Sequence, residues 1–94
     1  MANGQKLEGI VVNKDTKEEL PFVNVLYNTR LSLGVSTDVN GKFTIEDRGL
    51  IEKLQITSIG FEPVVITLAD IPKTGVLKIE MQELTTNLQE AVVK

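Results

Sequence analysis

The sequence lacks two residue types on which much protein chemistry depends. It contains no cysteine, which excludes disulfide bonds and thiolate metal sites. It also contains no histidine, the commonest general base and the commonest metal ligand. Serines and threonines are plentiful, but no histidine is present to activate one of them. We therefore expect no enzymatic activity and no bound cofactor.

Long apolar runs and blocks of like charge are missing as well. No run approaches the roughly 20 apolar residues that a membrane-spanning helix needs, and no signal peptide opens the chain. The net charge is −3 and charged residues make up 24% of the sequence. This mildly acidic balance does not suggest the basic surface that binds nucleic acid. We interpret residues 1–6 as a disordered or expression-derived tail, and residues 1–4 have the look of a trimmed start that a native leader could have preceded.

The residues that are present suit one small domain. The chain has 94 residues, and 41% of them are hydrophobic, which is enough for a core. Apolar and polar residues alternate in short runs separated by turn residues, and no window keeps a helical stripe for longer than about one turn, the best being residues 50–54. We predict seven strands, over residues 7–12, 22–27, 34–37, 42–46, 53–59, 64–68 and 76–82.

Regular short strands with alternating burial are typical of sandwiches and barrels. Seven strands in fewer than 80 residues favour two small sheets that cover each other's apolar faces. The sequence therefore predicts an all-β, seven-stranded β-sandwich over residues 7–83. Residues 84–94 differ, because Leu88, Val92 and Val93 have no place in the sandwich. They could form a frayed extension, a helical turn or a linker toward a following domain, and we assign them as that linker.

Residues 36–47, S-T-D-V-N-G-K-F-T-I-E-D, have the spacing of a calcium loop. Oxygen-bearing side chains stand at positions 1, 3, 5 and 12, with glycine at position 6. The candidate calcium ligands are Asp38, Asn40 and Asp47. Such a loop requires a carboxylate at position 1, a glutamate at position 12 and a helix on each side. Ser36 and Asp47 do not meet these requirements, and both flanks are predicted strands.

The same stretch also fits the tip of a β-hairpin. Asn40 and Gly41 both tolerate a positive φ, which makes them a strong hairpin signal. Asp38 is placed to accept hydrogen bonds from the amides of Asn40 or Gly41. Phe43 then returns to the core. We predict that Asp38, Asn40, Gly41 and Phe43 form a structural hairpin and that no metal is bound.

Five segments, taken in order, resemble one known family. Residues 34–45 look like its most specific signature, G-T-x-T-D-x-x-G-x-F-x-I. Residues 7–11 resemble L-x-G-x-V, residues 15–25 resemble D-x-x-T-G-E-P-L-P-G-V-N-V, and residues 54–62 resemble L-x-x-S-x-I-G-Y-E. Residues 88–93 resemble L-x-E-V-V-V, the run that precedes the plug of a receptor. The chain is similar to the carboxypeptidase-regulatory-like domain, in the form found at the N-terminus of TonB-dependent outer-membrane receptors.

This resemblance implies a transthyretin-like (prealbumin-like) fold of seven strands and no catalysis. It implies a non-catalytic accessory domain of a TonB-dependent outer-membrane receptor or related cell-envelope protein, at the periplasmic face of the outer membrane. The partners expected are envelope proteins or an attached C-terminal domain, without nucleic acid and without a membrane span in this chain. The chain could also dimerise through strand edges.

Two alternatives remain. One is a small-ligand or calcium-binding module. The other is a regulatory subdomain attached to a metallocarboxypeptidase, whose zinc ligands would lie outside these residues. The chain departs from the family pattern at Lys17 and Phe22, which stand where glycine is common. Both departures fall in turns, so they affect loop shapes rather than the fold.

Overall fold

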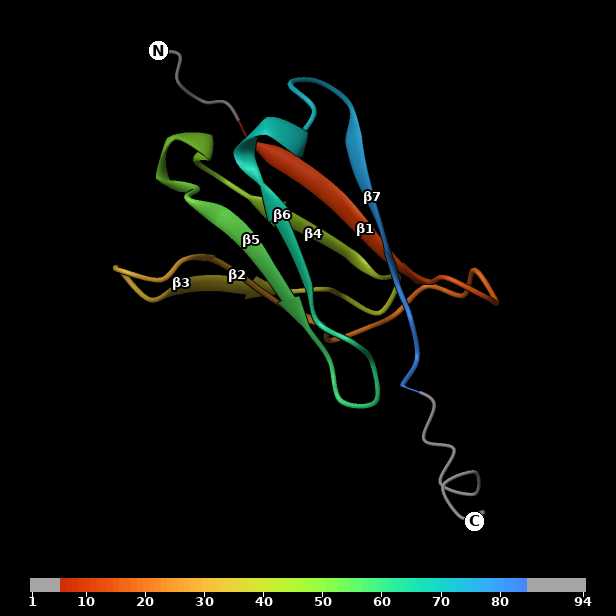
Figure 1. Ribbon diagram of the computed structural model, residues 1–94. Helices are drawn as coiled ribbons and strands as arrows, with labels where there is room; N and C mark the ends of the chain where they lie inside the picture. The colour runs from red at the N-terminus through yellow and green to blue at the C-terminus, as the bar shows by residue number, and fades with distance from the viewer. Residues whose placement is uncertain (1–5, 85–94) are drawn as a thin grey trace.

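The structure is a computed structural model that describes residues 6–84. These residues form seven strands and two short 3₁₀ turns (Figure 1). The strands are β1 (Leu7–Asn13), β2 (Asn24–Asn28), β3 (Leu33–Ser36), β4 (Lys42–Ile45), β5 (Lys53–Thr57), β6 (Val64–Thr67) and β7 (Val76–Met81). The 3₁₀ turns are η1 (Arg48–Leu50) and η2 (Leu68–Asp70).

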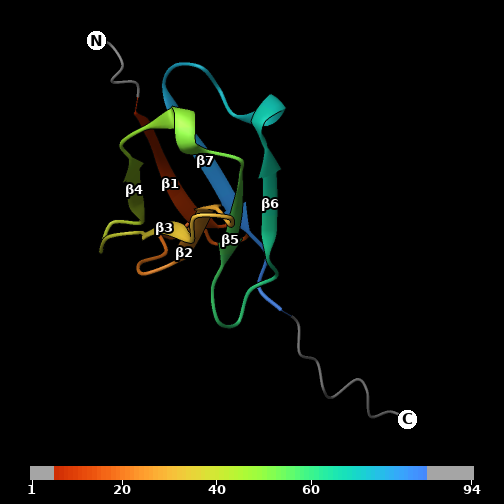
Figure 2. The same ribbon diagram turned by 90° about the vertical axis from the view of Figure 1, so that its left-hand side faces the viewer.

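The strands form two sheets, which confirms the predicted all-β sandwich of seven strands. One sheet has the order β4-β1-β7 and the other the order β3-β2-β5-β6. All neighbours are antiparallel except β1 and β7, which run parallel over six residue pairs. In the turned view of Figure 2, β4 and β6 lie on opposite sides of the molecule. The edges of the two sheets are therefore distinct surfaces.

The core lies between the sheets because successive strand residues point to opposite faces. Strand β7 shows this alternation from end to end, with Leu77, Ile79 and Met81 buried and their neighbours exposed. Phe43 and Ile45 face the same core from β4, as predicted. The buried hydrophobic cluster is Leu7, Val11, Val23, Val25, Phe43, Ile45, Ile51, Leu54, Ile56, Ile71, Leu77, Ile79 and Met81.

The second strand begins two residues later than predicted. Phe22 has a φ of +56° and its side chain is 69% exposed. This left-handed backbone cannot continue a strand, so residues 21–22 form a turn and β2 starts at Asn24. Strand β5 likewise ends at Thr57 rather than at Ile59, because Gly60 adopts a φ of +90° in the turn that follows.

Residues 50–54, the best helical stripe in the sequence, do not form a helix. The nearest helical element is the 3₁₀ turn η1 (Arg48–Leu50), which begins after Asp47. The side chain of Asp47 accepts a hydrogen bond from the amide of Gly49 at 2.8 Å and so caps the turn. Strand β5 already starts at Lys53, which is why no helix forms over residues 50–54.

One end of the sandwich is closed by the chain that follows β7. Phe61 forms a bridge with Glu83, and the amide of Leu84 donates to the carbonyl of Gly60 at 2.9 Å. Phe61 is half-buried and packs against the core. Beyond this bridge, β6 and β7 each have a neighbour on one side only among residues 6–84.

The described chain enters at one end of the sandwich and leaves at the other. Strand β1 follows the first described residue, Lys6, and β7 is followed by the last described residue, Leu84. Because β1 and β7 run parallel, the start of β1 and the end of β7 lie at opposite ends (Figure 1). The tail over residues 1–6 and the linker over residues 84–94 lie outside the described residues, except for Lys6 and Leu84.

Candidate functional site

The signature segment forms a tight turn between the two sheets. The Asp38 carboxylate accepts hydrogen bonds from the amides of Asn40 at 2.8 Å and Lys42 at 2.9 Å. The amide of Gly41 donates to the Asp38 carbonyl, and the amide of Asp38 donates to the Lys42 carbonyl, both at 2.9 Å. These bonds fold residues 38–42 into a compact turn that redirects the chain.

This turn is not the tip of a hairpin of paired strands. Strand β3 belongs to the four-stranded sheet and β4 to the three-stranded sheet, so the strands before and after the turn do not pair. Only Gly41 adopts a positive φ, of +76°, whereas Asn40 does not. The type I′ turn that an Asn-Gly pair favours in a two-residue hairpin needs a positive φ at both positions. The prediction of a hairpin was therefore wrong, because the turn carries the chain from one sheet to the other.

Glycine at position 41 is required by close contacts as well as by its backbone angle. A Cβ atom there would lie 2.7 Å from the Val11 carbonyl oxygen and 3.0 Å from the Leu20 amide nitrogen. Two residues later, Phe43 enters the core over Gly9. A Cβ atom on Gly9 would lie 2.3 Å from Cζ of the Phe43 ring. The ring of Phe43 therefore occupies space that any other residue at position 9 would fill.

Thr37 is a central residue of this turn that the sequence analysis did not single out. It is 2% exposed, and its hydroxyl donates to the Leu20 carbonyl at 2.7 Å and accepts from the Val23 amide at 2.8 Å. Its own amide donates to the Val23 carbonyl at 3.0 Å. Thr37 thus joins the end of β3 to the segment that leads into β2. The signal was its place in the signature, just before Asp38.

The three candidate calcium ligands have other partners. Asp38 caps the turn described above, Asp47 caps η1, and Asn40 donates its amide to Asp38. Within residues 6–84 no group of three or more acidic, histidine or cysteine side chains is placed to hold a metal ion. The amides of Lys42 and Asn40 hold the pKa of Asp38 below its ordinary value. The carboxylate is thereby stabilised by the backbone itself.

Two other carboxylates have lowered pKa values for similar reasons. The pKa of Glu52 is lowered by a hydrogen bond from the amide of Thr29, at 3.1 Å from its Oε1. The pKa of Glu80 is lowered by a hydrogen bond from Lys17, whose Nζ lies 2.7 Å from its Oε2. Glu52 and Glu80 therefore stabilise loops at the surface. Neither carboxylate lies beside a second group with which it could share general acid and general base roles.

Two buried asparagines also organise loops, and the sequence analysis missed both. Asn13 Oδ1 accepts from the amides of Asp15 at 2.8 Å and Thr16 at 3.1 Å. Asn28 Oδ1 accepts from the amide of Leu31, and its Nδ2 donates to the Leu50 carbonyl at 2.8 Å. Each asparagine is the last residue of a strand, which is the sequence signal for an Asx turn.

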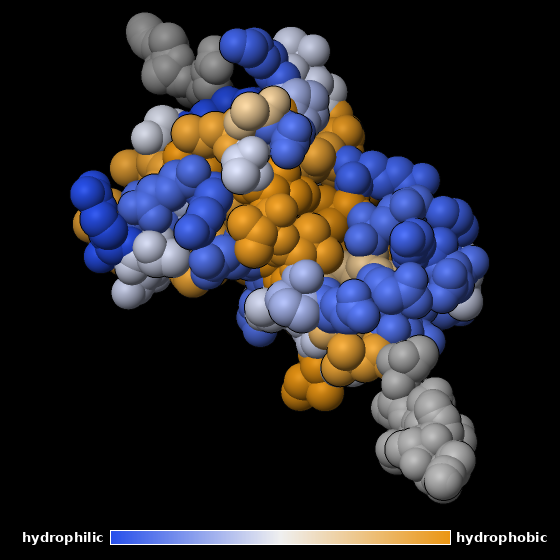
Figure 3. Space-filling view, in the orientation of Figure 1, coloured by the Kyte–Doolittle hydropathy of each residue, from blue (hydrophilic) through white to orange (hydrophobic). Residues whose placement is uncertain are grey.

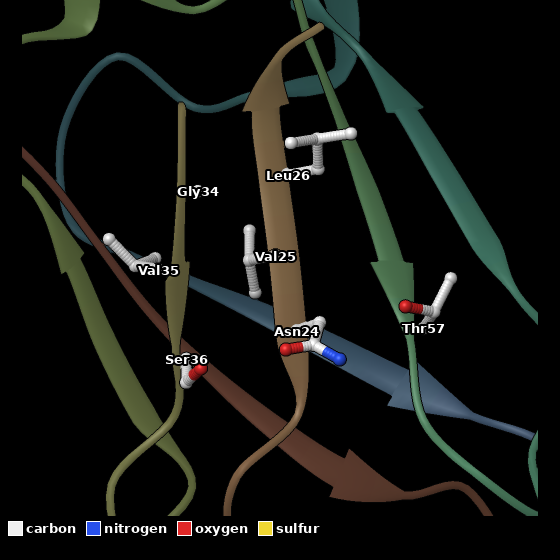
Figure 4. A pocket seen from close by; sticks show the side chains of 7 residues that line it. All are labelled: Asn24, Val25, Leu26, Gly34, Val35, Ser36 and Thr57. Atoms are coloured by element: carbon white, nitrogen blue, oxygen red, sulfur yellow. The ribbon is translucent and has the colours of Figure 1, made fainter. Parts of the chain in front are cut away.

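A shallow hollow lies on the outer face of the four-stranded sheet (Figure 4). It exists because Gly34 stands opposite Leu26 and supplies no side chain to the sheet surface. Ser36, Asn24 and Thr57 form a polar row across the three strands beside it. The lining residues are Asn24, Val25, Leu26, Gly34, Val35, Ser36 and Thr57. None of them titrates, so the hollow offers no general acid, general base or carboxylate ligand.

The fold and the capped turn between the sheets define a small all-β sandwich module. A family model for the CarboxypepD_reg-like domain matches residues 7–93, which is nearly the whole chain. The chain therefore belongs to the CarboxypepD_reg-like domain family, which confirms the resemblance. No characterised protein matches the sequence at a significant level. Within residues 6–84, no helix is long and apolar enough to cross a membrane.

The two departures from the family pattern keep the backbone that glycine would adopt. Lys17 has a φ of +67° and Phe22 has a φ of +56°. Both lie in the left-handed region, where a side chain is disfavoured. The amide of Lys17 donates to the Asn13 carbonyl and that of Phe22 to the Thr37 carbonyl. These bonds hold the two turns in place although lysine and phenylalanine stand where glycine is common.

Proposed function

We propose that this domain is a non-catalytic accessory module of a TonB-dependent outer-membrane receptor or a related cell-envelope protein. It would lie at the periplasmic face of the outer membrane, and its work would be structural or the docking of partners. The observation that carries the proposal is the family match over residues 7–93, together with the ordered motifs that resemble the receptor-associated form. The last of these motifs, residues 88–93, lies outside the described residues.

The polar side chains of the signature support a structural role. Thr37 and Asp38 both direct their oxygen atoms at backbone amides. Among the described residues, no buried side-chain nitrogen or oxygen lacks a hydrogen-bond partner. An active site usually keeps such groups free for a substrate. The signature residues therefore hold the two sheets together, which is the task of a scaffold.

The free strand edges support a docking role. Each sheet ends in strands with one neighbour within residues 6–84, namely β4 and β7 in one sheet and β3 and β6 in the other. Unpaired backbone groups at such edges accept a strand from a partner chain. A partner or an attached domain could dock there without any specialised pocket.

The experiment is to sequence the coding region beyond both ends of this chain and to locate the encoded protein by cell fractionation. We expect a secretion signal upstream, plug and barrel sequences downstream, and the protein in the outer-membrane fraction. A coding region for a single domain, with the protein in the cytosol, would contradict the proposal. Zinc-ligand motifs in a neighbouring catalytic domain would point instead to a metallocarboxypeptidase.

A further inference from the structure

The turn between the sheets contains Asn40 followed by Gly41, a dipeptide with a chemistry of its own. Asparagine is a thermolabile residue. It loses its side-chain amide most readily before glycine, because glycine has no side chain to hinder an approach by its own backbone nitrogen. Asn40 is exposed, whereas Gly41 is buried. The sequence repeats the dipeptide at Asn3-Gly4, outside the described residues.

The deamidation of Asn40 requires a free backbone nitrogen at Gly41. This nitrogen loses its proton and attacks Cγ of the Asn40 side chain. A C–N bond forms, the bond between Cγ and the side-chain nitrogen breaks, and ammonia leaves with the proton. Water then adds to either carbonyl carbon of the cyclic imide and breaks its bond to the ring nitrogen. The product is aspartate or isoaspartate, and water is the only co-reactant.

Hydrogen bonds hold Gly41 on both sides in the folded turn. Its amide donates to the Asp38 carbonyl at 2.9 Å, and its carbonyl accepts from the Val11 amide at 2.8 Å. A Cβ atom on Gly41 would lie 2.7 Å from the Val11 carbonyl oxygen, so the backbone is tightly enclosed there. The Gly41 nitrogen therefore has neither a free proton nor the room to move toward the Asn40 side chain.

Charge opposes the reaction as well. The Asp38 carboxylate accepts hydrogen bonds from the amides of Asn40 and Lys42, the two neighbours of Gly41 in the chain. A negative charge on the Gly41 nitrogen would therefore form close to an existing one. Two like charges at such a separation repel each other. The cap that shapes the turn thus also suppresses the attacking nitrogen.

The cover over the turn is a polar loop rather than the core. A Cβ atom on Gly41 would lie 3.0 Å from the Leu20 nitrogen and 3.1 Å from Glu19 Cβ, in the segment that follows β1. Residues 14–19 of this segment are all exposed. Figure 3 shows hydrophilic surface on the right-hand side, where this loop lies in Figure 1. Moving the loop exposes little apolar surface, so the turn can open without unfolding of the core.

We propose that Asn40 is a latent deamidation site, which the folded turn keeps unreactive and which reacts when the turn opens. Isoaspartate then prevents the turn from closing, because its backbone runs through the former side chain and gains an extra carbon atom. Gly41 is packed too closely against Val11 and Leu20 to shift in response. The modification thereby loosens the junction between the sheets. This inference does not depend on the cellular role proposed above.

The first measurement compares the folded chain with the urea-unfolded chain at the same mildly alkaline pH. Peptide mapping by mass spectrometry follows Asn40, and Asn3 in the unfolded chain gives the rate of the same dipeptide without structure. In urea we expect Asn40 to react as readily as Asn3. In the folded chain it should react at least about tenfold more slowly, since local opening must come first. Equal Asn40 rates in both states would overturn the proposal, and so would an Asn40 that stays intact in urea while Asn3 reacts.

The second measurement removes the cap. Asp38→Ala should raise the Asn40 rate in the folded chain at least about fivefold. The matched control is Asp47→Ala, which removes a capping carboxylate that lies 2.8 Å from the Gly49 amide in η1. It should change the Asn40 rate less than about twofold. Urea unfolding verifies that both variants are folded. Equal rates in the two variants would mean that overall stability, rather than this turn, protects Asn40, which overturns the assignment.

The third measurement tests the consequence of the reaction. The isolated isoaspartate product is compared in urea unfolding with Asn40→Asp, which adds the same charge and keeps the normal backbone. We expect the product to unfold at a clearly lower urea concentration than Asn40→Asp. The same unfolding midpoint for both proteins would show that isoaspartate fits the turn, and this would overturn the proposed loosening of the junction.

Discussion

Replacing Thr37 with valine tests whether the turn between the sheets depends on one buried hydroxyl. Valine has nearly the same shape as threonine, so the change removes hydrogen bonds and leaves the packing intact. The Val23 amide would lose its acceptor at 2.8 Å and the Leu20 carbonyl its donor at 2.7 Å. The Val23 amide is buried and cannot turn to water instead, whereas the Leu20 carbonyl is only partly buried.

The expected loss of stability follows from the number of groups left unpaired. Each buried backbone group without a partner costs about 1–3 kcal/mol. The surroundings of Leu20 are only partly buried, so we expect a total near the lower half of the range, about 2–4 kcal/mol. For a domain of this size the melting temperature should fall by roughly 10–25 °C.

The measurement is thermal and urea unfolding followed by circular dichroism. Thr37→Ser keeps the hydroxyl and loses one methyl group, so it should cost only about 1 kcal/mol. Thr57→Val, at an exposed position in β5, should change stability by less than about 0.5 kcal/mol. If Thr37→Val is as stable as the wild-type chain, the hydroxyl does not hold the turn and the reasoning is refuted.

Four further predictions concern the turns and the carboxylates. Gly41→Ala should destabilise the domain by about 2–4 kcal/mol in urea unfolding, because position 41 has a positive φ and a Cβ atom there would clash with the backbone. Gly60→Ala should cost only about 1 kcal/mol, because position 60 has a φ of +90° but nothing within 4 Å of a Cβ atom. Equal costs for the two variants would contradict this reasoning. Phe22→Gly should stabilise the domain by about 0.5–1 kcal/mol in the same assay by relieving a left-handed φ, and a loss of stability would contradict this. The pKa of Asp38 is lower in the folded state, so its contribution to the free energy of unfolding is present at neutral pH and is lost as the pH falls through that lowered pKa. Between about pH 5 and pH 3, the Asp38→Asn variant should therefore lose less stability than the wild-type chain. Identical pH profiles of the two proteins would contradict the capping role of Asp38. Calcium at about 5 mM should leave the melting temperature unchanged, and a rise that Asp38→Asn abolishes would restore the calcium hypothesis.

The strands were predictable because each carries a period of two. Phe43 and Ile45 in β4, and Leu77 and Ile79 in β7, alternate with polar neighbours and face the core as expected. Such a pattern is local, so it appears in the sequence itself. It does not state which strands become neighbours. The partition into two sheets depends on contacts far apart in the sequence, and the predicted hairpin at Gly41 failed for that reason.

The candidate site was predictable in outline. The turn at Gly41 and the capping role of Asp38 follow from residue types that favour turns. Thr37 escaped notice because a threonine in a polar stretch reads as exposed, and only the folded chain brings Leu20 and Val23 to its hydroxyl. Phe22 was predicted to open a strand because a run of alternating residues follows it, yet its backbone is set by the turn it occupies.

The parallel pairing of β1 and β7 has a mechanical consequence. The two strands are neighbours over six residue pairs, and the described chain enters through one and leaves through the other. A pull on the two ends of the chain would draw these strands past each other along their length. All the hydrogen bonds between them would then be loaded in shear at once, rather than opened one by one as in a zipper. The sandwich should therefore resist tension applied before Leu7 and after Met81 better than a fold whose terminal strands are pulled apart one bond at a time.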